Sequence, residues 1–168
     1  MSEKDPAATA VELELADEAA TAALAARIAE LARPPDVIGL SGDLGTGKTT
    51  FARAFIRARA GAAWDEEVPS PTFTLVQIYD LAGGRVHHFD LFRVENPEAA
   101  RELGVDEAFA EGISLIEWPE RLAGAWPADR LEIELSHGRR VEARGVRLIG
   151  LGRWRNLLAR AFAEPVRG

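Results

Sequence analysis

The sequence contains no cysteine and only three histidines. Disulfide bonds and thiolate zinc sites are therefore excluded, and a metal site would have to be built mainly from carboxylate, hydroxyl or phosphate oxygens. Long apolar runs are also lacking, since no stretch approaches the roughly 18 residues of a transmembrane helix. Residues 1–9 are polar and have no apolar centre of the kind found in signal peptides. We therefore expect a soluble, cytoplasmic protein that makes no use of a membrane.

Excess positive charge is also absent, because the net charge is −7 at pH 7. A free-standing nucleic-acid binder is disfavoured, since binding to a phosphate backbone depends on clustered positive charge. The distribution is uneven, however: residues 137–160 contain seven arginines and one acid and carry +6, which leaves −13 for the rest. This Arg-rich stretch predicts a contact surface for protein or, indirectly or weakly, tRNA, and a solvated strand and helix face is an equally good interpretation.

Lysine is scarce, because 18 of the 20 basic residues are arginines and only Lys4 and Lys48 are lysines. Lys48 lies in the segment G-D-L-G-T-G-K-T at 42–49, which matches the Walker A pattern of phosphate-binding loops. An apolar strand at 37–40 precedes this loop, and a helix is expected from Thr49 onward. Its apolar residues Phe51, Ala54, Phe55 and Ala58 would share one helix face.

The chemistry of polyphosphate binding explains this spacing. Three glycines let the backbone curl around the anion, so that N–H groups and the helix N-terminus face it. Lys48 would reach the β- and γ-phosphates, and the Thr49 hydroxyl would ligate Mg²⁺. The predicted phosphate-binding residues are Gly42, Asp43, Leu44, Gly45, Thr46, Gly47, Lys48, Thr49 and Thr50.

The remaining periodicities predict an α/β fold of three layers. The sheet is expected to be mixed and mostly parallel, with an antiparallel hairpin and with helices on both faces. We expect a disordered tail at 1–9 and a single P-loop domain over 10–168. The further strands are expected at 11–15, 72–81, 86–94, 113–116, 131–135 and 140–151. The further helices are expected at 18–33, with Asp17 as its cap, and at 97–101, 105–110 and 154–162.

Two acidic residues are expected at the ends of apolar strands. Glu117 closes the strand at 113–116, as a metal-binding Walker B carboxylate does, and one carboxylate with Thr49 and phosphate oxygens suffices for Mg²⁺. Asp90 is a candidate for orienting the attacking water, or else a buried cap or a partner of Arg93. His87 and His88 are neighbours in a strand, face opposite sides, and are interpreted as structural.

Four ordered motifs resemble the TsaE (YjeE) family, a group of small bacterial ATPases needed to make threonylcarbamoyladenosine in tRNA. They are G-D-L-G-T-G-K-T-T-F at 42–51, S-P-T-F-T-L-V at 70–76, H-F-D-L-F-R at 88–93 and I-E-W-P-E-R at 116–121. The resemblance covers about residues 11–121. It implies binding of Mg-ATP, a P-loop fold, and partnership with TsaB and TsaD, the second of which carries the threonylcarbamoyl transfer.

The resemblance also implies roles for single residues. Lys48 and Thr49 would hold phosphate and Mg²⁺, Glu117 would be a second metal-side carboxylate, and Asp90 would lie near the γ-phosphate. A switch loop at 70–73 would bring Thr72 to the phosphates. The same resemblance places Asp17, Glu18 and Thr21 at the adenosine end and Trp118 close to the site. One departure is Phe92, where the family pattern has tyrosine, so the hydroxyl is missing here.

Two other functions fit a Walker loop in a chain of this length. A small-molecule or nucleoside kinase would need an acceptor pocket and an arginine-bearing lid, and residues 96–112 have the length of a lid but contain only Arg101 as a basic residue. A nucleotide-gated binding module would hydrolyse ATP only incidentally. A GTPase is disfavoured, because two isolated lysines leave no Asn-Lys-x-Asp motif.

Overall fold

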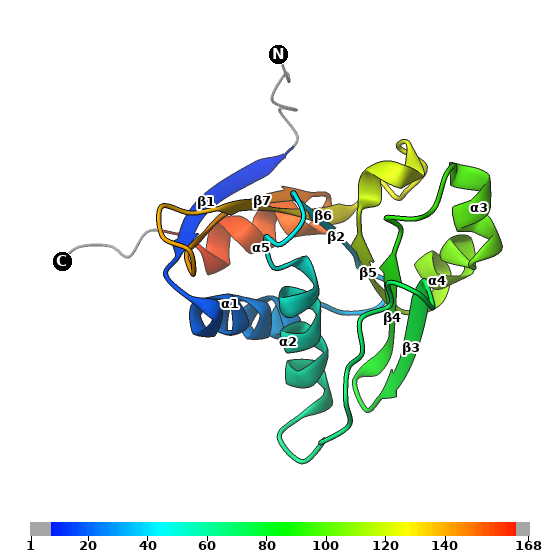
Figure 1. Cartoon of the computed structure of the whole chain (residues 1–168), viewed down its shortest axis with the longest axis horizontal. Helices are drawn as coiled ribbons and strands as arrows, with labels where there is room; N and C mark the ends of the chain where they lie inside the picture. Colours follow the sequence, from blue (N-terminus) through cyan, green and yellow to red (C-terminus); the bar gives the residue numbers. More distant parts are fainter. Residues whose placement is uncertain (1–7, 164–168) are drawn as a thin grey trace.

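A seven-stranded mixed sheet forms the middle layer of the fold (Figure 1). The computed structural model describes residues 8–163. In sheet order, the strands are β1 (Thr9–Leu15), β7 (Arg144–Leu151), β6 (Arg130–His137), β2 (Val37–Ser41), β5 (Ile113–Glu117), β4 (Gly84–Asp90) and β3 (Val76–Leu81).

The parallel part of the sheet is its centre. Strands β6, β2, β5 and β4 run parallel to one another, whereas β3 pairs with β4 as the predicted antiparallel hairpin. A second antiparallel group lies at the other edge, where β7 pairs with both β6 and β1. The α/β class and the mixed sheet are confirmed, and β1 is an edge strand, as its alternating apolar pattern indicates.

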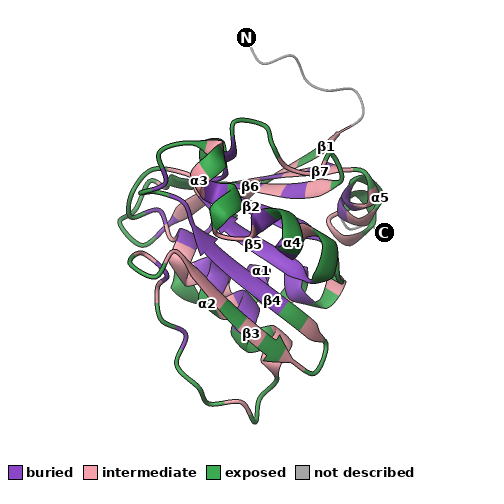
Figure 2. Ribbon diagram, turned by 90° about the vertical axis from the view of Figure 1, so that its right-hand side faces the viewer, coloured by how far each residue is buried: buried purple, intermediate pink, exposed green. Residues whose placement is uncertain are grey.

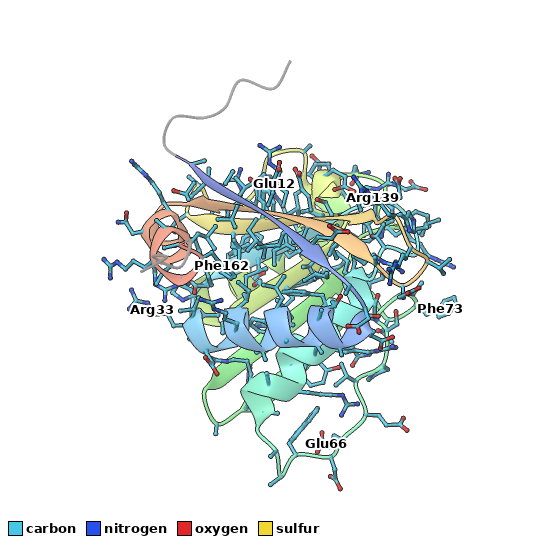
Figure 3. The ribbon with its side chains drawn as sticks, turned by 90° about the vertical axis from the view of Figure 1, so that its left-hand side faces the viewer. Glu12, Arg33, Glu66, Phe73, Arg139 and Phe162 are labelled. Atoms are coloured by element: carbon cyan, nitrogen blue, oxygen red, sulfur yellow. The ribbon has the colours of Figure 1, made fainter. Side chains whose placement is uncertain are left out.

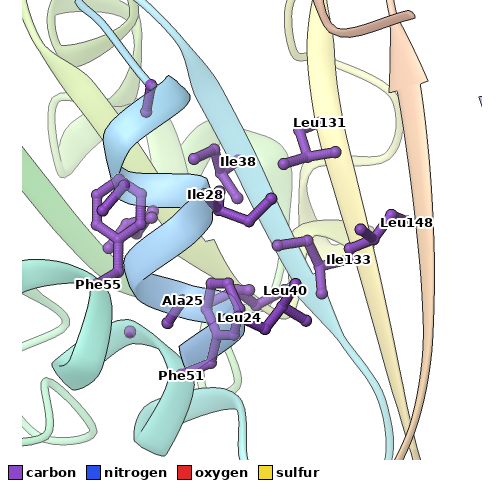
Figure 4. Close-up of a cluster of buried hydrophobic side chains, with 14 of the residues drawn as sticks. Leu24, Ala25, Ile28, Ile38, Leu40, Phe51, Phe55, Leu131, Ile133 and Leu148 are labelled. Atoms are coloured by element: carbon purple, nitrogen blue, oxygen red, sulfur yellow. The ribbon is translucent and has the colours of Figure 1, made fainter. Parts of the chain in front are cut away.

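Helices cover both faces of the sheet, as predicted. Helices α1 (Glu18–Leu31), α2 (Lys48–Ala60) and α5 (Arg153–Ala161) contribute to the larger buried cluster, part of which is drawn in Figure 4. The opposite face carries the smaller cluster under α3 (Pro97–Glu102), α4 (Val105–Glu111) and the 3-10 helix η1 (Pro119–Leu122).

Strand β2 supplies side chains to both clusters. Ile38 and Leu40 enter the larger cluster and Val37 enters the smaller one. Gly39 has no side chain on this second face, and a Cβ there would lie 2.5 Å from the ring of Trp126. Figure 2 shows the central strands in the colour of buried residues. Burial on both faces is what a parallel sheet requires, and it fixes the strand ends that carry the site.

Helix α2 buries a wider face than the sequence indicates. Phe51 and Phe55 are fully buried as expected, but Ala58 is exposed, and Ala52 and Ile56 are buried instead. The reason is that α2 packs against α1 as well as against the sheet. The expectation that Ala58 belongs to the buried face was therefore wrong.

Several predicted boundaries shift by a few residues. The strand expected at 140–151 begins only at Arg144, because residues 138–143 form a turn closed by the bond from Gly138 N to Ala143 O (2.9 Å). Thr9 begins β1 and so does not belong to a tail, while residues 1–7 of the expected tail and 164–168 lie outside the described part of the chain. Within residues 8–163, none of the helices combines the length and apolarity needed to span a bilayer.

Candidate functional site

Three parallel strands end at the same edge of the sheet, and the site lies there. β2 leads into the glycine-rich loop, β4 ends at Asp90 and β5 ends at Glu117. Glu117 is in register with Leu40 of β2 on one side and with Asp90 of β4 on the other. The carboxyl ends of parallel strands are the usual position of ligand sites in α/β sheets.

The loop at 42–49 curls because its three glycines adopt backbone angles that other residues avoid. Gly42, Gly45 and Gly47 have φ values of 140°, 78° and 100°. Gly42 also approaches the backbone of Leu135 so closely that a Cβ would collide with the carbonyl oxygen. Gly47 is the left-handed residue from which α2 starts. The loop thus delivers the N-terminus of α2, with its unpaired N–H groups, to the end of the sheet.

Lys48 is folded back over its own loop. Its Nζ donates to the carbonyl oxygens of Gly42 (2.6 Å) and Asp43 (2.8 Å) and lies 4.2 Å from the centre of the Trp118 ring. Burial lowers the pKa of Lys48, and the negative charge of Glu117 acts in the opposite direction. The lysine is therefore held by weak acceptors and a ring face, which an anionic ligand can replace.

The two predicted metal ligands meet. Thr49 Oγ1 donates to Glu117 Oε1 at 2.7 Å. Neighbouring oxygens around an octahedral Mg²⁺ ion lie roughly 2.9 Å apart, since Mg–O distances are about 2.0–2.1 Å. Both candidate metal ligands are oxygen atoms next to the glycine loop. The distance between them fits two adjacent ligand positions around Mg²⁺.

Asp90 is a buried acceptor at the end of β4. Its Oδ1 accepts from Phe92 N (3.0 Å) and its Oδ2 accepts from Thr72 Oγ1 (3.2 Å), which lies 2.7 Å from Ser70 Oγ. The loop at 70–73 is thereby attached to the site through Thr72. The bond from Phe92 N shows that Asp90 also caps the backbone, which was one of the two alternative roles. The other alternative, an ion pair between Asp90 and Arg93, both in the described part of the chain, is not formed, because the guanidinium carbon of Arg93 lies 4.8 Å from the ring centre of Phe73 instead.

Aromatic side chains form the rim. Trp118 follows Glu117 with a φ of 61°, unusual for a bulky residue, and its ring centre lies 4.9 Å from that of Phe92. Phe73 is 81% exposed and projects from the loop at 70–73 (Figure 3). Phe92 lacks the hydroxyl that the family pattern carries, and its ring packs on Trp118.

Two adjoining hollows collect most of the predicted binding residues. The larger, of about 390 Å³, is lined by Leu44, Gly45, Gly47, Lys48, Thr49, Thr50, Thr72, Asp90, Phe92, Arg93, Glu117, Trp118 and Arg144. The smaller, of about 110 Å³, is lined by Glu18, Thr21, Thr46, Gly47, Thr50, Glu142 and Arg144. Gly42 and Asp43 do not line either hollow and act through their carbonyls on Lys48. Asp17 is also outside, and its Oδ1 caps α1 by accepting from Ala20 N (2.9 Å).

Arg144 and His88 belong to the site although the sequence did not mark them as site residues, and Glu142, which lines the smaller hollow, was not predicted either. Arg144, assigned to the Arg-rich stretch, lines both hollows and donates to the loop carbonyls of Thr46 (3.0 Å) and Gly45 (3.3 Å). His88, interpreted as merely structural, is fully buried with its Nε2 at 2.7 Å from Glu117 Oε2. No local pattern marks Arg144, whereas the position of His88 two residues before Asp90 on the same strand was a usable signal.

Glu117 is fixed through both of its oxygens. A carboxylate only accepts hydrogen bonds, so His88 Nε2 carries the proton and donates. Thr49 holds the other oxygen. His88 therefore orients the carboxylate toward the glycine loop, as carboxylate partners orient ligands in many metal sites.

We predict that His88→Leu lowers the free energy of unfolding by roughly 1–3 kcal/mol, because one oxygen of the buried Glu117 carboxylate loses its donor. His88→Gln, which keeps a donor at a similar reach, should recover part of this loss. Urea unfolding followed by circular dichroism measures both variants. Equal stabilities of the two would contradict the assignment of His88 as a donor to Glu117.

This chain is similar in sequence to proteins of one family. A sequence model described as threonylcarbamoyl adenosine biosynthesis protein TsaE matches residues 15–146. The tRNA threonylcarbamoyladenosine biosynthesis protein TsaE of Bacillus subtilis is 39% identical over 114 residues, which are 67% of this chain and 69% of the relative. The protein of the same name from Rickettsia felis is 37% identical over 121 residues, 72% and 70% of the two chains.

A solved structure extends the similarity to the fold. The crystal structure of Bacillus subtilis YdiB superposes with a TM-score of 0.74 at 27% identity and covers 91% of this chain and 93% of its own. The TsaE protein of Aquifex aeolicus is 41% identical over 110 residues, 66% of this chain and 77% of the relative. With the family pattern matched from β1 into β7 and the same fold over nine tenths of its length, this chain belongs to the TsaE family.

Proposed function

We propose that this chain binds Mg-ATP in the larger hollow and hydrolyses it in the biosynthesis of threonylcarbamoyladenosine in tRNA, acting with TsaB and TsaD. The observation that supports this best is the meeting of four groups at one edge of the sheet: Lys48, Thr49, Asp90 and Glu117. Family membership connects the site to tRNA modification. Together the four groups supply what phosphoryl transfer to water requires: a cation for the phosphates, two oxygen ligands for a metal ion, and a carboxylate to orient the attacking water.

The loop and α2 would bind the polyphosphate through N–H groups and the helix N-terminus. Lys48 would exchange the carbonyls of Gly42 and Asp43 for the β- and γ-phosphate oxygens. Bound Mg²⁺ would neutralise charge on the phosphates. Thr49 and Glu117 would hold that ion, and Thr21 and Glu18 in the smaller hollow would face the nucleoside end.

Asp90 is suited to orient the attacking water. It is 5% exposed and each of its oxygens accepts one bond from the protein, which leaves lone pairs for a water molecule. Thr72 connects this carboxylate to the loop at 70–73, so ordering of that loop over the phosphates would also fix Asp90. Catalysis here is positioning rather than covalent chemistry.

We expect the isolated chain to hydrolyse ATP slowly, because the two arginines that line the larger hollow are engaged in other contacts. Arg93 lies over the Phe73 ring, and Arg144 donates to carbonyls of the loop. In these contacts, neither guanidinium is placed to stabilise the charge of a phosphoryl group during its transfer. In related P-loop enzymes such an arginine raises the rate by roughly 10³ to 10⁵, and it is sometimes supplied by a partner.

A kinase is less well supported. Residues 96–112, the candidate lid, form α3 and α4, and Ala100, Val105 and Ala108 of these helices are buried in the smaller core cluster. A segment that covers the core in this way is not free to open and close over an acceptor.

We predict that Lys48→Ala reduces Mg-ATP affinity at least tenfold, because a charge-assisted contact of roughly 1.5–3 kcal/mol is lost. Isothermal titration calorimetry measures the change. Arg57→Ala, an exposed position on the same helix, is the matched control and should bind as the wild type does. Wild-type affinity in a folded Lys48→Ala variant would refute the phosphate-binding role.

We predict different effects for the two carboxylates. Glu117→Gln should weaken nucleotide binding in the presence of Mg²⁺ at least tenfold, and Asp90→Asn should leave affinity within about threefold while lowering turnover at least a hundredfold. Metal ligation acts on the bound ground state, whereas water orientation acts chiefly on the transition state. Equal losses of affinity in both variants would contradict this division.

We predict that purified TsaB and TsaD together raise steady-state phosphate release at least tenfold, about 1.4 kcal/mol of barrier. Lys48→Ala mixed with the same partners is the control for contaminating ATPases. The result that would overturn the proposal is a fast reaction of the lone chain that the partners leave unchanged, or transfer of the phosphoryl group to a nucleoside or sugar acceptor instead of water.

A further inference from the structure

Arg144 joins two segments that lie almost a hundred residues apart. Its Nε and Nη2 donate to the carbonyls of Thr46 and Gly45 in the glycine loop. Its Nη1 donates to the carbonyls of Val141 and Ala143, both at 2.7 Å, in the turn between β6 and β7. One rigid guanidinium thus holds four backbone oxygens, two from each segment.

These bonds determine how the loop presents its amides. In a trans peptide the C=O and the N–H point in opposite directions. Carbonyls of Gly45 and Thr46 that are bound to Arg144 therefore direct the N–H groups of Thr46 and Gly47 away from the guanidinium. Thr46 N makes only a long bond to Asp43 O (3.4 Å). A glycine-rich loop without this clamp would sample several peptide orientations, because glycine restricts the backbone least.

The placement of Arg144 connects it to both parts of the site. It lines both hollows, between the phosphate end and the nucleoside end. An arginine has five N–H donors, and the four bonds to carbonyls leave one on Nη2. Most of the donor capacity of Arg144 is therefore used to hold backbone carbonyls, which is what a positioning role requires.

We propose that Arg144 is a positioning residue of the phosphate-binding loop, which fixes the peptide planes at 45–47 and couples the loop to the turn at 138–143. This inference rests on the proposed function for its effect on nucleotide affinity. The turn carries the exposed Arg139, which is labelled on the same side of the view as Phe73 in Figure 3, and Val141, which is 92% exposed.

The matched control is Arg147 on the same strand. Its nearest acid is Glu134, at 4.0 Å, and it lines neither hollow. We would compare Arg144→Gln, Arg144→Lys and Arg147→Gln with the wild type. Three measurements are needed: backbone order parameters of residues 45–47 from ¹⁵N relaxation without nucleotide, Mg-ATP affinity by calorimetry, and urea unfolding.

In Arg144→Gln the order parameters should fall from about 0.85 toward 0.6 or below, and affinity should fall at least tenfold. Arg147→Gln should change neither, and the two variants should unfold at similar urea concentrations. Arg144→Lys should recover affinity only in part, because an ammonium lacks the fork that spans two carbonyls. An unchanged loop in Arg144→Gln overturns the inference. Failure of the wild type to bind Mg-ATP refutes the proposed function, and the order parameters still decide the role of Arg144.

Discussion

The whole site depends on the parallel pairing of β4, β5 and β2. Their register places Leu40, Glu117 and Asp90 side by side, so the loop and both carboxylates reach the same edge of the sheet. A parallel sheet is stable only when both faces are covered, and here two separate core clusters cover them. A slip of one residue in β5 would turn Glu117 to the other face and separate it from Thr49 and His88. Packing far from the edge therefore holds the carboxylate in place.

Lys48 is a buried cation that lies among acidic side chains of the site. Lys48 is buried beside Glu117, Asp90 and Asp43, and burial lowers its pKa while these acids act in the opposite direction. Its direct partners are neutral carbonyls and the Trp118 ring. A polyphosphate would bring negative charge to the lysine, and a divalent cation would bring positive charge to Glu117. For the function proposed above, these two charges would offset each other, which favours joint binding of the polyphosphate and the cation over binding of either alone.

The parts that the sequence predicted are those fixed by local patterns. The glycine loop, the start of α2 and the strand ending at Glu117 each follow from a few neighbouring residues, and the mixed sheet with helices on both faces follows from the periodicities. The pairing of Thr49 with Glu117 could be expected because both belong to motifs, whereas contacts between distant segments that no motif marks could not be predicted. Arg144 contacts the loop across 98 positions, and the pairing of β7 with β1 depends on packing that no short pattern encodes. The burial of Ala52 and Ile56 was not predicted for the same reason, since it involves α1 packing beside α2.

Backbone strain is located where the site needs an aromatic wall. Trp118 adopts a left-handed φ of 61°, although only glycine, asparagine and aspartate do so readily. The bonds from Trp118 N to Leu40 O and from Leu91 N to Glu117 O both hold the peptide that precedes Trp118. The carbonyl that follows accepts from Arg121 N in η1, which begins directly afterwards. This turn brings the indole over Lys48 and against Phe92. Strand β5 thus ends at Glu117, whose carboxylate must stay in place, and the side chain of the next residue, Trp118, covers Lys48. Strain of this kind persists only when the surrounding structure enforces it, and here both neighbouring strands do.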